Sequence, residues 1–303
     1  MALHFTKPGE RVPVGTINLL IYGQPSTGKT SLCYTMRNPL VIDFDGGAHR
    51  SQQSTLGTTV RVDSWADIEE LFNSEAIGQF DTIVIDTVGS ALDYLANFII
   101  KSNPKMGTTK GTLTMAGWGE LKAVFSAWFR RVNVMGKNVV MIAHHKEDKE
   151  GDATRKRPDI QGSSYGLVMK QADYVGFAYL NEASKRVIGF SPTADYFGKD
   201  SARLGVVEIE DYDTNPEYGA GLIDRMRAAF EDVQKEDKQV KETVLTWFHL
   251  IDNADTPEQL TSHMPNVIAL PNPAGVQVKD MVKKHAAKMG WAWNSKAKKW
   301  EGA

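Results

Sequence analysis

One loop constrains the fold of this 303-residue chain more than any other feature, and its sequence is Gly23-Gln24-Pro25-Ser26-Thr27-Gly28-Lys29-Thr30. The loop matches the pattern G-x-x-x-x-G-K-[ST] in full, and it lies between an apolar run at 17–22 and a helical pattern at 28–36. Glycines let backbone N–H groups curl around phosphate oxygens, and a helix N-terminus adds partial positive charge. The sequence therefore predicts a strand, a phosphate-binding loop and a helix in succession.

Side chains at and beyond the end of this loop indicate which chemistry the site performs. Lys29 is expected to reach the β and γ phosphates of ATP, and the Thr30 hydroxyl is expected to bind Mg²⁺. Asp86 ends an apolar run, where such folds keep the aspartate that holds Mg²⁺ through water; a helix N-cap is its alternative role. We therefore predict an Mg²⁺-dependent ATPase, with ATP and Mg²⁺ as cofactors and Thr30 and Asp86 as metal-binding residues. The expected nucleotide-binding residues are Gly23, Gln24, Pro25, Ser26, Thr27, Gly28, Lys29, Thr30 and Ser31.

The residue after Asp86 decides where the water-activating group has to lie. Many ATPases place a glutamate there, but this chain has Thr87, so another base is needed. Asp45, just beyond the preceding predicted strand, is our candidate for orienting the attacking water; Asp43 is its competitor, and a turn role is the alternative for Asp45. His144 ends the next strand and is expected to sense the γ phosphate, with a surface histidine as the alternative. The predicted catalytic residues are Lys29, Asp45, Asp86 and His144.

Short apolar runs alternate with helical patterns over the first two thirds of the chain. This alternation predicts an α/β fold with a mainly parallel central sheet flanked by helices. Two stretches, 101–117 and 146–165, break the pattern and exceed the roughly 4–6 residues of an ordinary connection, so we expect long functional or disordered loops there. The predicted strands are 17–22, 39–43, 58–62, 82–86, 138–143 and 173–179, and the predicted helices are 28–36, 65–73, 88–101 and 119–135.

The chain changes character near residue 219, so we divide it into an ATPase core, 1–215, and a small, mostly helical C-terminal region, 216–303. A charged helix should run to about residue 253. Thr256-Pro257-Glu258-Gln259 then provides an N-cap, a proline at the first helical position and a capping glutamine. A linker at 270–275 leads to a last helix and to a hairpin that carries Trp291, Trp293 and Trp300.

Composition excludes several classes of protein. The net charge is −2, so a uniformly basic coat for nucleic acid is absent and any polyanion site has to be a local patch. Cys33 is the only cysteine, which excludes an internal disulfide and fits a reducing compartment. Residues 1–5 show no start of a signal peptide, and no stretch approaches the ~18 apolar residues of a membrane span. We expect a soluble cytoplasmic protein with no membrane partner.

Together these residues resemble the core of RecA-like recombinases over residues 16–210. The shared order is a P-loop, a strand followed by Asp-x-Asp, Asp-Thr after the Walker B strand, and a strand that ends in a polar sensor. Within that family the chain is similar to the phage group of RecA-like ATP-binding proteins, which are short single-strand-annealing recombinases. The resemblance implies a RecA-like P-loop NTPase fold, a homo-oligomer in the form of a ring or filament, and a place in the host cytoplasm.

The resemblance also implies single-stranded DNA as a partner, bound through 101–117 and 146–165, the latter with the Gly-rich limb 161–164. The candidate DNA-binding residues are Lys146, Arg155, Lys156 and Arg157, whose charge suits a phosphate backbone. A solvated charged loop is the alternative, because the same stretch contains Glu147, Asp148, Glu150 and Asp152. The segment 197–205 resembles the one that reaches a neighbouring subunit's nucleotide in this family. Lys199 and Arg203 are therefore alternative trans-acting candidates.

Two functions remain open at this point. The first is a DNA-dependent ATPase of phage-type recombination or single-strand annealing. The second is a nucleotide-gated loader or regulator whose partner is a replication protein or a single-stranded-DNA-binding protein. The basic, tryptophan-rich tail fits either one, because its tryptophans are expected to stack on bases or to bury themselves in a small core.

Overall fold

The computed structural model describes residues 13–150, 153–162 and 164–302, so the expectations for residues 1–5, Asp152 and Ser163 lie outside it. Contacts divide the chain into two compact units, and the boundary follows Phe230. The first unit is Pro13–Phe230, and the second consists, in its described part, of the residues from Glu231 onward. The boundary falls within helix α6 (Tyr218–Asp252), which begins in the first unit and ends in the second.

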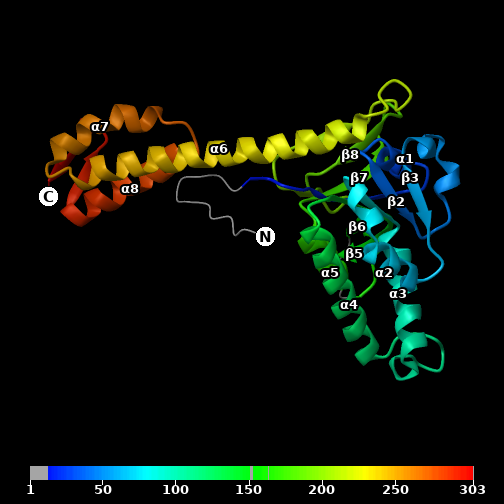
Figure 1. Cartoon of the computed structure of the whole chain (residues 1–303). Coiled ribbons are helices and arrows are strands. Elements are labelled where there is room, and N and C mark those ends of the chain that lie inside the picture. The colour runs from blue at the N-terminus through cyan, green and yellow to red at the C-terminus, as the bar shows by residue number, and fades with distance from the viewer. Residues whose placement is uncertain (1–12, 151–152, 163, 303) are drawn as a thin grey trace. The chain divides into compact units, whose positions relative to one another are not determined.

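The first unit is built on one large sheet (Figure 1). The strand order along it is β10-β8-β7-β1-β5-β4-β2-β3. The six strands from β7 to β3 are all parallel to their neighbours, and β8 and β10 continue the β7 edge in antiparallel fashion. Strand β5 separates the phosphate-loop strand β1 from β4, which ends in Asp86. The strands are β1 (Asn18–Gly23), β2 (Pro39–Asp43), β3 (Thr58–Arg61), β4 (Thr82–Asp86), β5 (Asn138–Glu150), β6 (Ala153–Pro158), β7 (Tyr174–Leu180), β8 (Arg186–Gly189), β9 (Lys199–Asp200) and β10 (Val206–Glu208).

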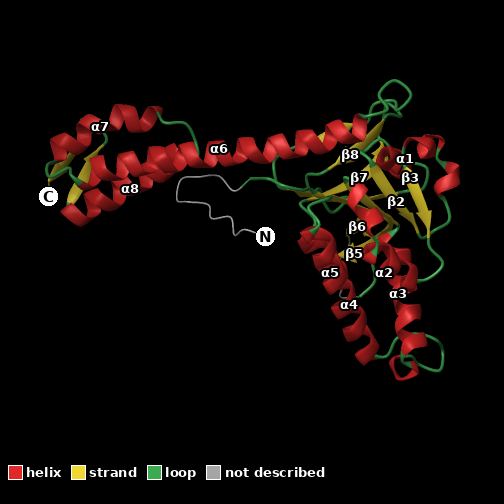
Figure 2. Cartoon of the chain, in the orientation of Figure 1, coloured by secondary structure: helices red, strands yellow, loops and turns green. Residues whose placement is uncertain are grey.

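Helices flank this sheet, as Figure 2 shows. Every residue of β2 and β4 is buried, which fits strands that are covered on both faces. Leu20, Ile42 and Met141 from the sheet share one buried cluster with side chains of α2, α3 and α4, where the Trp128 ring meets Trp65 edge-on at 5.4 Å. The helices of this unit, before α6, are α1 (Lys29–Tyr34), α2 (Trp65–Asn73), α3 (Val88–Ser102), α4 (Met115–Val134) and α5 (Ser164–Gln171).

The stretch 146–165 is not the loop that the sequence predicts. Strand β5 continues beyond the sheet to Glu150 and pairs with β6, so the segment forms a two-stranded arm, which we call the charged hairpin (145–150 with 153–158). Its register places Glu147 opposite Lys156 and Asp148 opposite Arg155, and opposite charges in such positions stabilise strand pairing. The prediction of a loop was wrong because the two strands are paired through charged residues. Such strands lack the alternation of apolar and polar residues by which a strand is recognised in a sequence.

The stretch 101–117 is also more ordered than a long loop. A 3-10 turn at Pro104–Met106 is followed by a bridge between Gly107 and Leu113, and the Thr114 hydroxyl caps α4 by accepting from the Gly117 amide. Helix α4 therefore begins at Met115, four residues before the predicted start.

The second unit confirms the predicted helical region that ends in a hairpin. Thr256 and Gln259 form the expected capping box at the start of α7, and Gly290 ends α8 in the left-handed conformation with φ 74°. Trp291 and Trp300 pack against a small buried core, which favours the structural alternative for these two rings. No helix within the described residues is long and apolar enough to cross a bilayer. The elements after α6 are α7 (Pro257–Ala269), α8 (Ala274–Met289), β11 (Trp291–Asn294) and β12 (Lys299–Gly302).

Candidate nucleotide site

The predicted catalytic residues converge on one cavity of about 260 Å³ at the carboxyl ends of the parallel strands. Since β1, β2, β4 and β5 are neighbours there, residues that lie over a hundred positions apart in sequence share one wall. The predicted residues that line the cavity are Pro25, Ser26, Gly28, Lys29, Thr30, Ser31, Asp45, Asp86 and His144. The remaining members of the predicted nucleotide set, Gly23, Gln24 and Thr27, lie behind this lining and contact Lys29.

The side chain of Lys29 is hydrogen-bonded to backbone carbonyls of the phosphate loop itself. The Lys29 ammonium donates to the carbonyls of Gly23 at 3.1 Å and Gln24 at 2.6 Å. Burial lowers the pKa of Lys29 to about 8, although the charge of Asp86 acts in the opposite direction. Gly28 stands at φ 84°, a left-handed conformation that favours glycine, and no side chain caps the first amides of α1. These amides and the lysine are the donors that phosphate oxygens require.

Thr30 and Asp86 bring two oxygens together at the base of the cavity. The Thr30 hydroxyl donates to Asp86 Oδ2 at 2.7 Å. Burial raises the pKa of Asp86 to about 6, and the hydrogen bond from Thr30 offsets part of that shift. Adjacent hydroxyl and carboxylate oxygens are donors that suit Mg²⁺, which keeps several water or phosphate ligands. Within the described residues no group of three His, Cys, Asp or Glu side chains gathers into a metal site.

Asp43 and Asp45, the two candidates for the water-activating base, have different contacts in the structure. Both carboxylate oxygens of Asp43 accept backbone amides, from Gly47 and Ala48, each at 3.0 Å, so this side chain is occupied in holding the turn. Asp45 makes longer contacts: its Oδ2 lies 3.7 Å from His144 Nε2, and its Oδ1 lies 3.5 Å from the Thr87 hydroxyl. Its side chain is 28% exposed. Asp45, Thr87 and His144 thus form a polar group in the cavity of the phosphate loop.

Two arginines that were not predicted from the sequence, Arg50 and Arg186, lie at the site. Arg50 lines the cavity, and within the described residues no hydrogen-bond or ion-pair partner is found for it. Arg186, on β8, reaches the loop from the other side: its Nη1 would lie 3.0 Å from a Cβ added at Gly28. Its guanidinium stacks 5.2 Å from the ring of Tyr212, whose hydroxyl donates to the Gly28 carbonyl. Neither arginine belongs to a sequence motif, and β8 follows the loop by more than 150 residues, so no local pattern could have found them.

The candidate DNA-binding residues lie outside the cavity, on the charged hairpin, and each has an intramolecular contact. Lys146 pairs with Asp159 at 2.8 Å, and Arg157 pairs with Asp148 at 2.8 Å. The other two face aromatic rings, because the Arg155 guanidinium lies 3.9 Å from the ring centre of Phe197 and the Lys156 ammonium lies 5.6 Å from that of Phe177. The hairpin therefore presents a network of compensated charges.

The two trans-acting candidates differ in their surroundings. The Lys199 ammonium donates to the Ala172 carbonyl of the same chain, and the residue is half-buried in the short strand β9. Arg203 is exposed and stands in the left-handed conformation, φ 61°, at the turn that follows. Arg203 is therefore the more exposed of the two residues.

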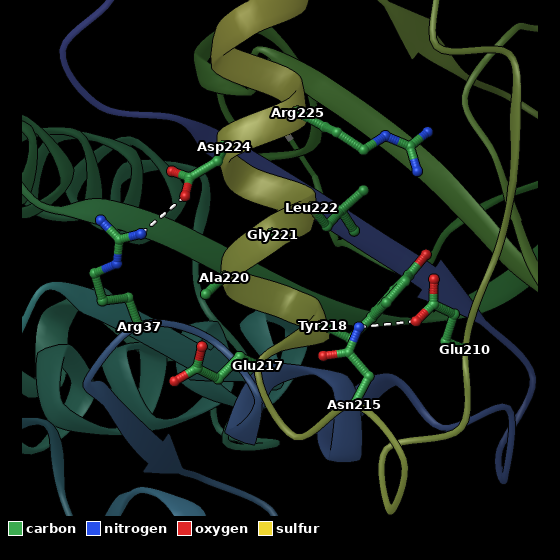
Figure 3. A pocket seen from close by; sticks show the side chains of 10 residues that line it. All are labelled: Arg37, Glu210, Asn215, Glu217, Tyr218, Ala220, Gly221, Leu222, Asp224 and Arg225. Atoms are coloured by element: carbon green, nitrogen blue, oxygen red, sulfur yellow. Dashed lines mark hydrogen bonds and ion pairs between the residues drawn. The ribbon is translucent and has the colours of Figure 1, made fainter.

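A second hollow, of about 380 Å³, lies beside the first turns of α6 (Figure 3). Four of its polar side chains form two pairs: Arg37 pairs with Asp224 at 2.8 Å, and the Asn215 amide donates to Glu210 at 2.8 Å. No residue of the phosphate loop is among those that line it. It is thus separate from the cavity that contains Lys29.

Known proteins resemble this chain to different extents. A curated relative, the SPbeta prophage-derived uncharacterized protein YorG of Bacillus subtilis (strain 168), is 25% identical over 139 residues, which are 44% of this chain and 42% of that protein. The chain thus spans less than half the length of this relative. Among solved structures, the crystal structure of the RadB recombinase matches with a TM-score of 0.36 and 14% identity, over 60% of this chain and 83% of that one. Residues 16–202 match the model of the AAA domain family, and since this is more than half of the sequence, the chain belongs to that family of nucleotide-binding P-loop NTPases.

Proposed function

We propose that the chain hydrolyses ATP and couples hydrolysis to the binding of single-stranded DNA. The observation that carries the first part is the group formed by Asp45, Thr87 and His144, which shares a cavity with Lys29 and the Thr30–Asp86 pair. One wall of the cavity offers cationic and amide donors for phosphates, and the other offers a carboxylate that can take a proton. This division is what hydrolysis of a phosphoanhydride requires.

Each residue has one task in this proposal. Lys29 leaves the carbonyls of Gly23 and Gln24 and neutralises the β and γ phosphates. Thr30 and Asp86 would hold Mg²⁺, and the ion would supply positive charge beside the phosphate oxygens. Asp45 orients the attacking water and accepts its proton. His144, 3.7 Å from Asp45, senses the γ phosphate by hydrogen bonding.

The path from nucleotide to DNA follows strand β5. His144 lies where β5 leaves the sheet, and the same strand continues without a break into the charged hairpin. Tyr22, the residue before the phosphate loop, lies with its hydroxyl 3.1 Å from the Lys156 carbonyl and donates at 2.5 Å to that of Phe197. The hairpin is thus joined to β1 by the Tyr22 hydroxyl and to β5 by the continuous strand, and both of these strands reach the nucleotide site. A displacement of His144 on ATP binding would be passed to the hairpin directly.

DNA binding at the hairpin proceeds in this proposal by exchange of partners. Lys146 and Arg157 release Asp159 and Asp148 and pair with backbone phosphates instead. Such an exchange weakens affinity, since the carboxylates compete with the phosphates, and it makes binding steeply dependent on salt. The chain acts as a homo-oligomer, and Arg203 of one subunit, which is exposed, completes the nucleotide site of the next.

Phage-type recombination or single-strand annealing is the process that we propose for this activity. It rests on the similarity of the nucleotide-site residues to phage RecA-like ATP-binding proteins and on a relative of prophage origin. A second candidate is a nucleotide-gated loader of a replication protein. It is favoured by the compensated charges of the hairpin and by an apolar groove in the second unit, described below.

The test measures phosphate release at low salt with and without oligo-dT. We expect stimulation by DNA in the unaltered chain, and reduced stimulation in the double variant Lys146→Ala with Arg157→Ala. Each cation that contacts a phosphate contributes a slope of about −0.7 in log K against log salt for single strands, so the double variant should lose a slope of about 1.4.

The matched control removes two cations that are also ion-paired, Lys235 and Lys238 on α6, by substitution with alanine. It should retain both the stimulation and the slope. Hydrolysis that does not respond to DNA contradicts the coupling and favours the loader. Equal loss in the control and the test variant would mean that net charge, and not the hairpin, determines binding.

A further inference from the structure

An apolar groove of about 270 Å³ opens between α7, α8 and the terminal hairpin of the second unit. We call it the lysine-rimmed groove, and it is formed by Met264 and Ile268, Lys279 and Lys283, and Trp293 and Trp300. Ile268 is 59% exposed, so the groove reaches the surface with an apolar wall. A water molecule has a share of about 30 Å³ in the liquid, so the space equals roughly nine waters and admits one large apolar side chain.

The groove is apolar within and positive at its rim. Lys279 and Lys283 stand one turn apart on α8, and within the described residues no hydrogen bond or ion pair is found for either ammonium group. Their neighbour Lys284 differs, because Asp280 pairs with it at 2.7 Å. The surrounding sequence adds to this charge, since residues 257–302 contain seven lysines, three carboxylates and no arginine, a net charge of +4.

The arrangement suits a peptide better than a strand of DNA. Base stacking needs an open aromatic face, but Trp300 packs against the small core and meets Trp293 at 63° and 5.3 Å. Trp291 is likewise held against the ring of His285 at 5.7 Å. What stays open is a hollow lined by methionine, isoleucine and tryptophan edges, which anchors aliphatic or aromatic side chains in peptide complexes.

From this geometry we propose that the lysine-rimmed groove binds an acidic segment of a partner protein, with one large apolar side chain seated between α7 and α8. The carboxylates of the segment pair with Lys279 and Lys283, and its apolar side chain covers Ile268 and the edge of Trp293. The proposal is independent of ATP hydrolysis, because every residue that it uses lies in the second unit.

The experiment measures binding of labelled peptides to the full chain without nucleotide, by fluorescence anisotropy. The probe is a short peptide of Asp and Glu residues that ends in Phe, and it is compared with the same peptide ending in Ser. We expect the Phe peptide to bind at least tenfold more tightly, with an affinity that falls as salt rises. Ile268→Asp should weaken it tenfold or more, and Lys279→Glu with Lys283→Glu should weaken it about tenfold.

Two exposed positions outside the groove serve as matched controls. Val276→Asp places the same charge on an equally exposed aliphatic position of α8, and Lys296→Glu reverses a lysine of the hairpin turn. Both should bind the Phe peptide as the unaltered chain does, and circular dichroism checks that all variants are folded. Equal binding of the two peptides, or no binding of either, overturns the proposal. Binding of oligo-dT that Ile268→Asp and the double lysine variant abolish, with no peptide binding, would assign the groove to DNA instead.

Discussion

Substitution of Asp45 by asparagine is the sharpest test of the catalytic assignment. The amide keeps the size of the side chain and removes only its ability to accept a proton. General-base catalysis contributes about 10²–10⁴-fold. Because Asp45 is held only by contacts of 3.5 Å to Thr87 and 3.7 Å to His144, we expect the lower part of that range. A loss of about 10²–10³-fold in kcat corresponds to about 2.7–4 kcal/mol of activation free energy.

The affinity of the Asp45→Asn variant for nucleotide should rise or stay unchanged. No contact joins Asp45 to Lys29 or Thr30 among the described hydrogen bonds and ion pairs, and its charge repels bound phosphates. Phosphate release at saturating ATP gives kcat, and titration with a fluorescent ATP analogue gives the dissociation constant. Glu69→Gln, on an exposed position of α2, removes one charge without touching the site and serves as control.

Two results would refute this reasoning. A kcat within about fivefold of the unaltered chain means that Asp45 is not the base, since even a weakly positioned base contributes more. The second is a weakened nucleotide affinity that accounts for the whole loss, which would give Asp45 a binding role. Asp43→Asn is informative beside it: we expect lower thermal stability, because that carboxylate holds the amides of Gly47 and Ala48.

Two further predictions concern the charges around the phosphates. Affinity for the ATP analogue should fall as pH rises through about 8, because the buried Lys29 amine loses its proton there and with it the attraction for phosphates. The arginine in Lys29→Arg keeps its charge beyond pH ~12, so the affinity that this variant retains should not decline through pH 8. A decline that persists in the variant would mean that another group causes the pH dependence. Arg50→Ala should lower kcat about tenfold or more, because a cation that faces the phosphates stabilises charge in the transition state. Arg61→Ala, beside Gly46 on β3 and outside the cavity lining, is its control, and equal effects of the two variants would contradict a specific role.

Local sequence patterns were sufficient to predict those structural elements that depend only on neighbouring residues. The strands Pro39–Asp43 and Thr82–Asp86 and the helix Trp65–Asn73 have the predicted bounds, because their apolar periods are short-range and uninterrupted. The same holds for the capping box of Thr256 and for the glycine that ends α8. The α/β architecture follows from these elements, since parallel strands with crossover helices have few ways to pack.

Features that depend on contacts between distant residues could not be predicted from the sequence. The sequence left Asp43 and Asp45 as competitors, and only the turn geometry occupies Asp43 with two amides. The charged hairpin looked like a loop because its stability comes from opposite charges across two strands, which have no period along one strand.

The phosphate loop is the part of this protein that the sequence alone determined, because eight consecutive residues contain both its backbone flexibility and its charge. The tertiary structure decided what surrounds it. Strand order brings Asp45, Asp86 and His144 to one edge, and β8 adds Arg186 beside Gly28. It also decided which lysines of the tail are paired and which remain at the rim of a groove. Such juxtapositions arise from packing between distant segments, whose free energy no local pattern of residues records.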